Sequence, residues 1–524
     1  MHIFQNAQFI SCEERSRVFS ILVVEGGRIA HCGDSLPEKM QGGKRIDLQG
    51  QCVVPAFGDT HIHFSSFSLF HAGLDCREAS DFSDLGELVV SYAEKHPRRK
   101  IIFGFGCSAH SVKEGTLPVR TTLDGLTSRP LLIVKYDGHG AVANSALIDK
   151  LPRHVTAARG YREETGWFYQ EAFFSLIDHV TRAVSPADAF GNLIGGADFM
   201  AGRGIGLIHT VEGVGFPADM DVDMMRFAAR GLPQEFRIYF QTMDIRKVLR
   251  RKMPRIGGCF ATALDGCFGS EDAALREPYS NNQANKGVLY YSGEQIVRFV
   301  TQANRAGLQV ELHAIGDAAV EQALAAYEAA LKDFPREDHR HVIIHACLMD
   351  RGQVERAARL GIHVAVQTPF LHWNLEPTAY IESLVGTRIR NLSPLKTMVD
   401  AGLRPANGSD APCTIPDPVF GIWAACNHPD PSESVSVIDA LRMHTDWAAR
   451  LSFDERERGT LTEGKWADFT VLDRNPLQMP ASDLNKIRVR DLYLKGERYA
   501  APPAGPLSLA LACLRGRDRR HVPA

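Results

Sequence analysis

Short apolar runs alternate with longer amphipathic stretches through the middle of the chain. Eight runs have the length of a β-strand and are bounded by Gly, Pro or polar residues. They cover Gln51–Pro55, Leu131–Tyr136, Leu207–Val211, Cys259–Leu264, Leu308–Leu312, Val342–Ile344, His363–Val366 and Arg404–Asn407. Glu294–Ala306 and Asp317–Leu331 have helical spacing. This alternation predicts βα units around a parallel sheet, and eight such units close into a TIM-like (β/α)8 barrel of the α/β class.

Both ends of the chain have a different sequence pattern from the middle, with short β-rich runs and hairpin turn signals. Val18–Val24 leads into a Glu-Gly-Gly-Arg turn, and Trp466–Asp473 shows a comparable strand pattern near the other end. Because chain termini often lie close together, we expect one small composite β-sandwich domain built from both ends. The predicted division is 1–54 and 455–500 for this domain, 55–454 for the barrel with an insertion at about 64–130, and 501–524 for a loosely packed C-terminal extension.

Composition changes this picture little but narrows the class of partner. The chain has 524 residues, 44% hydrophobic and 23% charged, with a formal net charge of -3. No basic field favours nucleic acid or an anionic membrane, and no apolar run has transmembrane length. Residues 1–10 lack the pattern of a signal peptide. A small-molecule substrate is therefore expected, and assembly into a homo-oligomer is left open.

The cysteines point to a reducing compartment. Their number, 11, is odd, and no two are spaced as Cys-x-x-Cys. A long chain with such cysteines fits reduced cytoplasmic thiols better than a disulfide framework. Cys259 and Cys267 lie near a predicted strand, where small apolar packing is the expected role.

Two histidines at the start of the barrel region carry the first chemical signal. His61 and His63 follow an apolar run with one residue between them, so on a strand their side chains share a face. Neutral imidazole is a good ligand for zinc, iron and nickel. A single His-x-His pair is weak evidence, so the other strand ends decide whether a metal binds here.

Three further candidate ligands follow other predicted strands. His313 and His345 come after the fifth and sixth strands, and Asp410 follows the eighth. Since catalytic groups of such barrels gather at the C-terminal strand ends, these side chains and the first two histidines are expected to meet at one cation. A bound metal lowers the pKa of its water to about 7. Asp410 is the expected proton carrier beside that water.

The same residues resemble the metal-dependent amidohydrolase superfamily, and most closely amidohydrolase family 3, which includes N-substituted formamide deformylases. The similarity covers nearly the whole chain. Its motifs are Pro55–His63, Asp137-Gly138-His139, Thr165-Gly166 to Glu171-Ala172, His313–Asp317, Gly408–Pro412 and Gly464–Phe469. The resemblance implies a TIM-like barrel with a composite β domain. It also implies that His61, His63, His313, His345 and Asp410 bind metal or lie beside it.

One departure from the family concerns the metal count. Many members carry a carboxylated lysine at the end of the fourth strand, bridging two metals, and the matching position here is Ala261. Without a bridging carboxylate, two close cations would repel strongly. We therefore expect about one divalent ion per chain, with zinc ahead of iron or manganese, or a pair bridged by another carboxylate. Glu171, which the resemblance places near the metal, is the candidate.

Four other residues are candidates for contacting the substrate. His139 follows the predicted second strand and can polarise a substrate carbonyl, as a second catalytic residue. Phe370 and Trp373 follow the seventh strand as a candidate aromatic wall, with a buried structural role as the alternative. His209, at the end of the third predicted strand, orients a ligand or only packs.

These observations favour a metal-dependent hydrolase of a carbon–nitrogen bond other than a peptide bond, in an amide, formamide or cyclic amide. A deaminase of an amino-heterocycle is the alternative within the same scaffold. A non-catalytic ligand-binding relative is the alternative of another class, and the complete set of five ligands argues against it.

Overall fold

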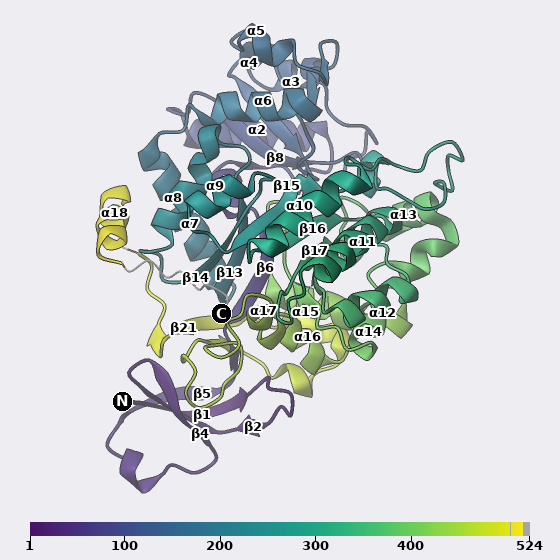
Figure 1. Cartoon of the computed structure of the whole chain (residues 1–524). Helices are drawn as coiled ribbons and strands as arrows, with labels where there is room; N and C mark the ends of the chain where they lie inside the picture. Colours follow the sequence, from purple (N-terminus) through teal and green to yellow (C-terminus); the bar gives the residue numbers. More distant parts are fainter. Residues whose placement is uncertain (503–504, 517–524) are drawn as a thin grey trace.

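Three β-sheets organise the protein in the computed structural model, which describes residues 1–502 and 505–516. The central sheet is the barrel. A sheet from both chain ends lies on one side of it, and a sheet from an inserted segment lies on the opposite side (Figure 1). Among the described residues, no helix has the length and apolar character needed to cross a membrane.

The barrel contains eight parallel strands in sequence order. They are β6 (Phe57–Ile62), β13 (Ile205–Glu212), β14 (Glu235–Phe240), β15 (Arg255–Ala263), β16 (Gln309–Ala314), β17 (Val342–His345), β18 (His363–Val366) and β19 (Ala406–Asn407). Their side chains are almost all buried, as expected for a parallel sheet covered by helices. The expected TIM-like α/β fold is confirmed.

Two of the eight predicted barrel strands were wrong, and two real strands were missed. Gln51–Pro55 belongs to β5 (Lys44–Pro55) of the terminal sheet, and Leu131–Tyr136 overlaps β9 (Leu131–Lys135) of the inserted sheet. The missed strands are β6 and β14. Strand β14 contains Glu235 and Arg237, which are buried in ion pairs, so its sequence does not have the pattern of an apolar strand.

Helices cover the outside of the barrel. Those that follow or precede its strands are α7 (Pro186–Gly202), α8 (Met220–Ala228), α9 (Ile245–Arg250), α10 (Gly293–Arg305), α11 (Asp317–Asp333), α12 (Arg351–Leu360), α14 (Leu395–Asp400), α15 (Pro418–Cys426), α16 (Val437–Met443) and α17 (Asp446–Leu451). The two predicted helices correspond to α10 and α11. Helix α10 begins with a capping box in which Ser292 and Gln295 satisfy each other's backbone amides.

Hydrogen bonds between β6 and the residues that follow β19 close the barrel. The backbone N–H of Asp410 donates to the carbonyl of His61 at 2.7 Å. The Asp59 carboxylate accepts from the Ser409 backbone at 3.0 Å and from its hydroxyl at 2.6 Å. Segments 350 residues apart are thereby held in register at the C-terminal end of the barrel.

The terminal sheet confirms the expected composite β domain. Its strand order is β22-β21-β20-β5-β1-β3-β4, with β2 paired to β1. The strands are β1 (His2–Ile10), β2 (Val18–Phe19), β3 (Ile21–Glu25), β4 (Arg28–Gly33), β5, β20 (Phe469–Leu472), β21 (Val489–Leu494) and β22 (Glu497–Arg498). The antiparallel pairing of β20 with β5 joins the two ends of the chain.

The inserted sheet has the strand order β11-β12-β10-β9-β8-β7. These strands are β7 (Leu74–Asp75), β8 (Ile102–Cys107), β9, β10 (Gly140–Ala143), β11 (Tyr161–Arg162) and β12 (Trp167–Tyr169). Helices α1 (Phe64–His71), α2 (Phe82–Lys95), α3 (Arg120–Leu126), α4 (Ser145–Ile148), α5 (Arg153–Thr156) and α6 (Gln170–Thr181) accompany it. The sheet thus continues beyond residue 130, the expected end of the insertion. The division into domains stays a prediction.

The C-terminal segment forms one further helix. Helix α18 (Pro506–Arg515) lies against α7 and α8, with Leu509 and Cys513 buried. This part of the expected loose extension is therefore packed. Residues 503–504 and 517–524 of that extension lie outside the described residues.

Candidate metal centre and substrate pocket

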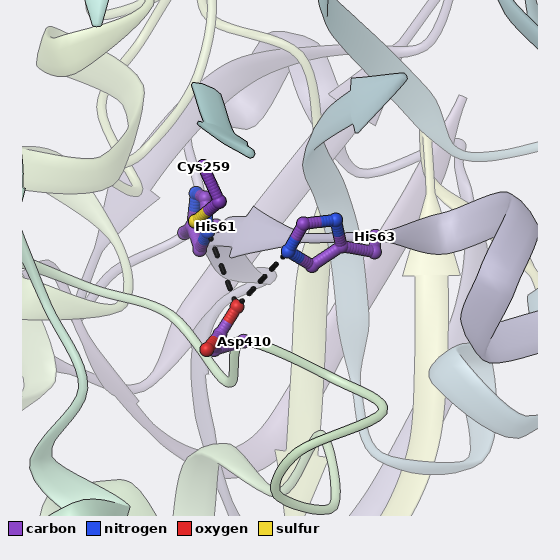
Figure 2. A group of neighbouring side chains, drawn as sticks. All are labelled: His61, His63, Cys259 and Asp410. Atoms are coloured by element: carbon purple, nitrogen blue, oxygen red, sulfur yellow. Dashed lines mark hydrogen bonds and ion pairs between the residues drawn. The ribbon is translucent and has the colours of Figure 1, made fainter. Parts of the chain in front are cut away.

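The first and last barrel strands bring two histidines and one aspartate together. One carboxylate oxygen of Asp410, Oδ1, lies 3.2 Å from Nε2 of His61 and 3.3 Å from Nε2 of His63 (Figure 2). His61 is in β6, and His63 is the residue that precedes α1. The closure of the barrel therefore also assembles three of the expected metal ligands.

Cys259 completes this group, although the sequence indicated only a packing role. Its Sγ lies 3.0 Å from Nε2 of His61 and 3.5 Å from Nε2 of His345. Cys259 is on β15, the fourth strand around the barrel, and is shown beside His61 in Figure 2. The ligand atoms of His61, His63, Cys259 and Asp410 all lie within 4.8 Å of one another.

His313 and His345 form a second group with the same cysteine. Their rings pack edge to face with centroids 4.6 Å apart, and their ligand atoms meet the 4.8 Å limit with Cys259. Gln367, just after β18, contacts Nδ1 of His345 through Oε1 at 2.6 Å. An Nδ1–H donated to Gln367 leaves the Nε2 lone pair of His345 free toward the cysteine.

Unusual backbone conformations occur at two ligands. His345 and Asp410 have positive φ angles of 71° and 54°, a region that non-glycine residues rarely adopt. Such conformations persist where surrounding contacts hold them, and they cluster at functional sites. Here the backbone N–H of Ala346 donates to the carbonyl of Ala314 at 3.0 Å, which fixes the turn after His345.

Burial sets the protonation of these groups. Desolvation lowers the pKa of His61 and His313 and lowers that of His345 to about 4, so the imidazoles are neutral at pH 7. Burial alone would raise the pKa of the Asp410 carboxyl, but contacts with His61 and His63 outweigh it and hold that pKa well below its usual range. Histidine binds a metal as neutral imidazole and aspartate binds it as ionised carboxylate, so these side chains are in the forms that bind metal.

The donor set fits a divalent cation. Nδ1 of His313 is buried without a hydrogen-bond partner among the described residues, and Oδ1 of Asp410 has no hydrogen bond beyond its ion-pair contacts with His61 and His63. Buried polar atoms of this kind are costly unless another group satisfies them. Imidazole nitrogens, a carboxylate oxygen and a cysteine sulfur are the usual donors to zinc. A divalent metal is thus the natural partner of this cluster.

Two adjoining hollows reach the cluster from the side of the inserted sheet. Both are lined by Asp137, His139, His313, His345, Asp410 and Cys413. One extends along the loop after β18, and the other extends under β8, β9 and α6. The inserted segment therefore forms part of the wall above the C-terminal strand ends.

The predicted substrate residues divide into two sets. His139 lines both hollows, in the loop between β9 and β10, although its strand lies outside the barrel. Phe370 and Trp373 line one hollow and stack on each other, with ring centroids 4.9 Å apart and planes 12° apart. His209 lines neither hollow. It is fully buried in the barrel interior, where desolvation lowers its pKa to about 3.

Glu171, the expected additional ligand, is not brought to the centre. It is exposed in the first turn of α6 and belongs to neither group that can hold a metal. The next residues of α6 do face the pocket, since Phe173 and Phe174 line the second hollow. The helix thus contributes aromatic surface, and the Glu171 carboxylate remains on the outside.

Near His139, the sequence singled out Asp137 but not its buried neighbours Lys135, Tyr136 and Glu376. The Lys135 ammonium lies 2.7 Å from Oδ2 of Asp137, and Oδ1 of Asp137 accepts from the His139 backbone at 3.1 Å. The Tyr136 hydroxyl donates to Oε2 of Glu376 at 2.8 Å. These pairs fix the loop that carries His139. The only signal in the sequence was charge inside an apolar run, which does not identify its partner.

An eight-stranded parallel barrel with this cluster at its C-terminal strand ends defines a metal-dependent hydrolase. The comparison with protein families gives the particular group: the amidohydrolase family model matches residues 44–500, and the chain belongs to that family. It is a hydrolytic enzyme that acts on carbon–nitrogen bonds other than peptide bonds, with a divalent metal as cofactor.

Individual relatives support this assignment. The putative amidohydrolase YtcJ of Bacillus subtilis is 27% identical over 522 residues, covering 93% of this chain and 96% of that protein. The N-substituted formamide deformylase of Arthrobacter pascens is 24% identical over 541 residues, covering 94% and 96%. The crystal structure of an uncharacterized metal-dependent hydrolase from Pyrococcus furiosus has a TM-score of 0.74 and 27% identity, covering 91% of this chain and 100% of that one.

Proposed function

We propose that the enzyme hydrolyses an amide, formamide or cyclic amide by means of metal-activated water. The observation that carries this proposal is the position of Asp410, which contacts both His61 and His63 and also lines both hollows. Formamides are included because a relative of similar length is an N-substituted formamide deformylase. The proposed ion is zinc, in keeping with the donor set of His, Asp and Cys.

The residues of the chain divide the chemical work. A bound divalent ion supplies an acidified water and Lewis-acid polarisation of a carbonyl. Asp410 accepts the proton of the attacking water and delivers it to the departing nitrogen. His139 donates a hydrogen bond to the oxygen on which negative charge develops. The mainly apolar walls hold the substituent of the substrate and limit water near the reacting carbon.

The same site can in principle serve amide hydrolysis or ring deamination, and the products separate them. The test is a panel of formamides, N-acyl amines, cyclic amides and amino-heterocycles, incubated with zinc-loaded enzyme. The proposal expects a free acid together with an amine, or an opened ring. Ammonia released only from amino-heterocycles would contradict it and favour the deaminase. Cytoplasmic location and assembly into a homo-oligomer stay predictions.

A further inference from the structure

We infer that Cys259 is a shared metal ligand whose thiolate bridges two divalent cations. His61, His63 and Asp410 would hold one cation, and His313 and His345 would hold the other. This inference rests on the proposed function of the same centre and concerns the architecture of its metal site. When the cations bind, the thiol proton of Cys259 passes to solvent and two sulfur–metal bonds form.

The sulfur of Cys259 lies between histidines of both metal-binding groups. Sγ lies 3.0 Å from Nε2 of His61 and 3.5 Å from Nε2 of His345, on two different strands. For tetrahedral zinc with bonds of about 2.0–2.3 Å, neighbouring donor atoms are separated by about 3.3–3.8 Å. The sulfur is therefore close to the spacing that ligands of a common ion require, and it has this spacing to both histidines.

The number of donor side chains is larger than one zinc ion binds. Six side chains converge here, whereas structural and catalytic zinc ions take about four protein or water ligands. Their ligand atoms separate into two groups, and only Cys259 belongs to both. One ion would leave part of this buried donor set unused. Two ions use all six donors and keep positions open for water and substrate.

An irregular stretch of β15 places the sulfur of Cys259 between the two groups of ligands. Between Gly258 and Ala263 the register with β16 shifts, and the intervening residues 259–262 form an irregular bulge. The hydroxyl of Thr262 bridges the bulge, accepting from the backbone N–H of Gly258 and donating to its carbonyl, both at 2.8 Å. A Cβ at Gly257 would lie 2.0 Å from the carbonyl oxygen of Glu311, so the bulge depends on glycine there.

Charge explains why a bridging thiolate matters. The expectation of about one ion assumed that no anionic side chain separates two cations, because Ala261 occupies the lysine position. Cys259, two residues earlier on the same strand, offers such an anion between the two groups. Ala261 offers no ligand atom in its side chain, and its backbone carbonyl accepts from the Tyr291 hydroxyl at 2.9 Å. A soft thiolate also favours zinc or cobalt over magnesium.

The test compares Cys259→Ala with Cys76→Ala, which removes an equally buried thiol from the inserted segment. Each protein is loaded with cobalt, dialysed, and examined for metal content and for thiolate-to-cobalt charge-transfer absorption. The wild type and Cys76→Ala are expected to retain two ions per chain and to show the absorption. Cys259→Ala should lose the absorption completely and retain at most half of the metal.

Three results would overturn the inference: a wild-type enzyme without charge-transfer absorption, a wild-type enzyme that retains only one ion per chain, or a Cys259→Ala variant that keeps the absorption. Hydrolysis is measured on the same wild-type sample. If the enzyme hydrolyses amides but shows no absorption, the bridging role of Cys259 is wrong and the proposed function is unaffected. If the absorption is present but no panel substrate is hydrolysed, the proposed function is wrong and the assignment of Cys259 as a ligand is unaffected.

Discussion

Oε1 of Gln367 lies 2.6 Å from Nδ1 of His345, and this contact fixes which ring nitrogen faces the metal centre. Gln367 is held in turn, because its amide N–H donates to the carbonyl of Ala365 at 3.2 Å. A ligand histidine oriented in this way binds metal more tightly than a free one. The glutamine therefore supports the centre without contacting the cation.

Replacing this glutamine should weaken metal binding. In Gln367→Leu, we expect metal affinity to fall by about 10- to 100-fold, the usual cost of removing such a supporting contact. Competition with a chromogenic chelator measures the change directly. Activity at saturating zinc should recover most of the wild-type value. An unchanged affinity would show that packing alone orients His345.

Asp410 should be required for turnover. In Asp410→Asn the side chain keeps its shape but loses the ability to take a proton, so we expect kcat to fall by at least about 10²- to 10⁴-fold. The assay is run at saturating zinc with metal content determined, since Asp410 also belongs to the ligand group. Circular dichroism should report an intact fold. If the zinc-loaded variant had the kcat of the wild type, Asp410 would not be the proton carrier.

Stability of the metal-free protein should fall in mild acid because of buried neutral histidines. His444 accepts from the Asn407 amide at 2.8 Å, and desolvation lowers its pKa to about 4. The unfolded chain binds this proton near pH 6.5, whereas the folded chain does not until about pH 4. Its contribution is present above pH 6.5 and is lost between those values at about 1.4 kcal/mol per pH unit.

The measurement is the thermal midpoint in chelator between pH 7 and 4.5. His444→Gln should show a shallower decline than the wild type, because one proton-linked group is gone. His154→Gln, which removes an exposed histidine, should keep the wild-type slope. Equal slopes in all three proteins would contradict the role given to His444.

The aromatic pair in the pocket should govern the size of the substrate. Trp373→Ala removes one face of the stack with Phe370, so KM for amides with an aromatic substituent should rise about three- to tenfold. Small formamides that do not reach the stack should keep their KM. An equal loss for both substrate types would mean that Trp373 only supports the loop.

Six of the eight barrel strands could be predicted, because buried parallel strands appear as short apolar runs. The same signal misled at Leu131–Lys135, since a buried strand of an inserted sheet has the same pattern. It was absent from β6, where Gly58, Asp59 and Thr60 interrupt the apolar run. The Asp59 carboxylate serves closure of the barrel through Ser409, so local propensity gave way to function there.

The site was predictable where ligands follow strands and not where backbone geometry decides. His61, His63, His313, His345 and Asp410 converge as expected. Cys259 was overlooked because a bulge, which residue spacing does not show, moves it into the ligand position. The paired glycines before it were the available signal. Glu171 was chosen from family resemblance alone, and helix α6 directs it outward.

The hydrogen bonds from Ser409 to Asp59 have a consequence for synthesis of the protein. The ligands His61 and His63 are translated some 350 residues before Asp410. These residues come from the two segments that meet where the barrel closes, the seam of the barrel. A ribosome-bound chain that ends before the seam residues lacks Asp410 and the contacts that align His61 with it. We therefore expect the cation held by His61, His63 and Asp410 to bind late, once the ring of strands is complete.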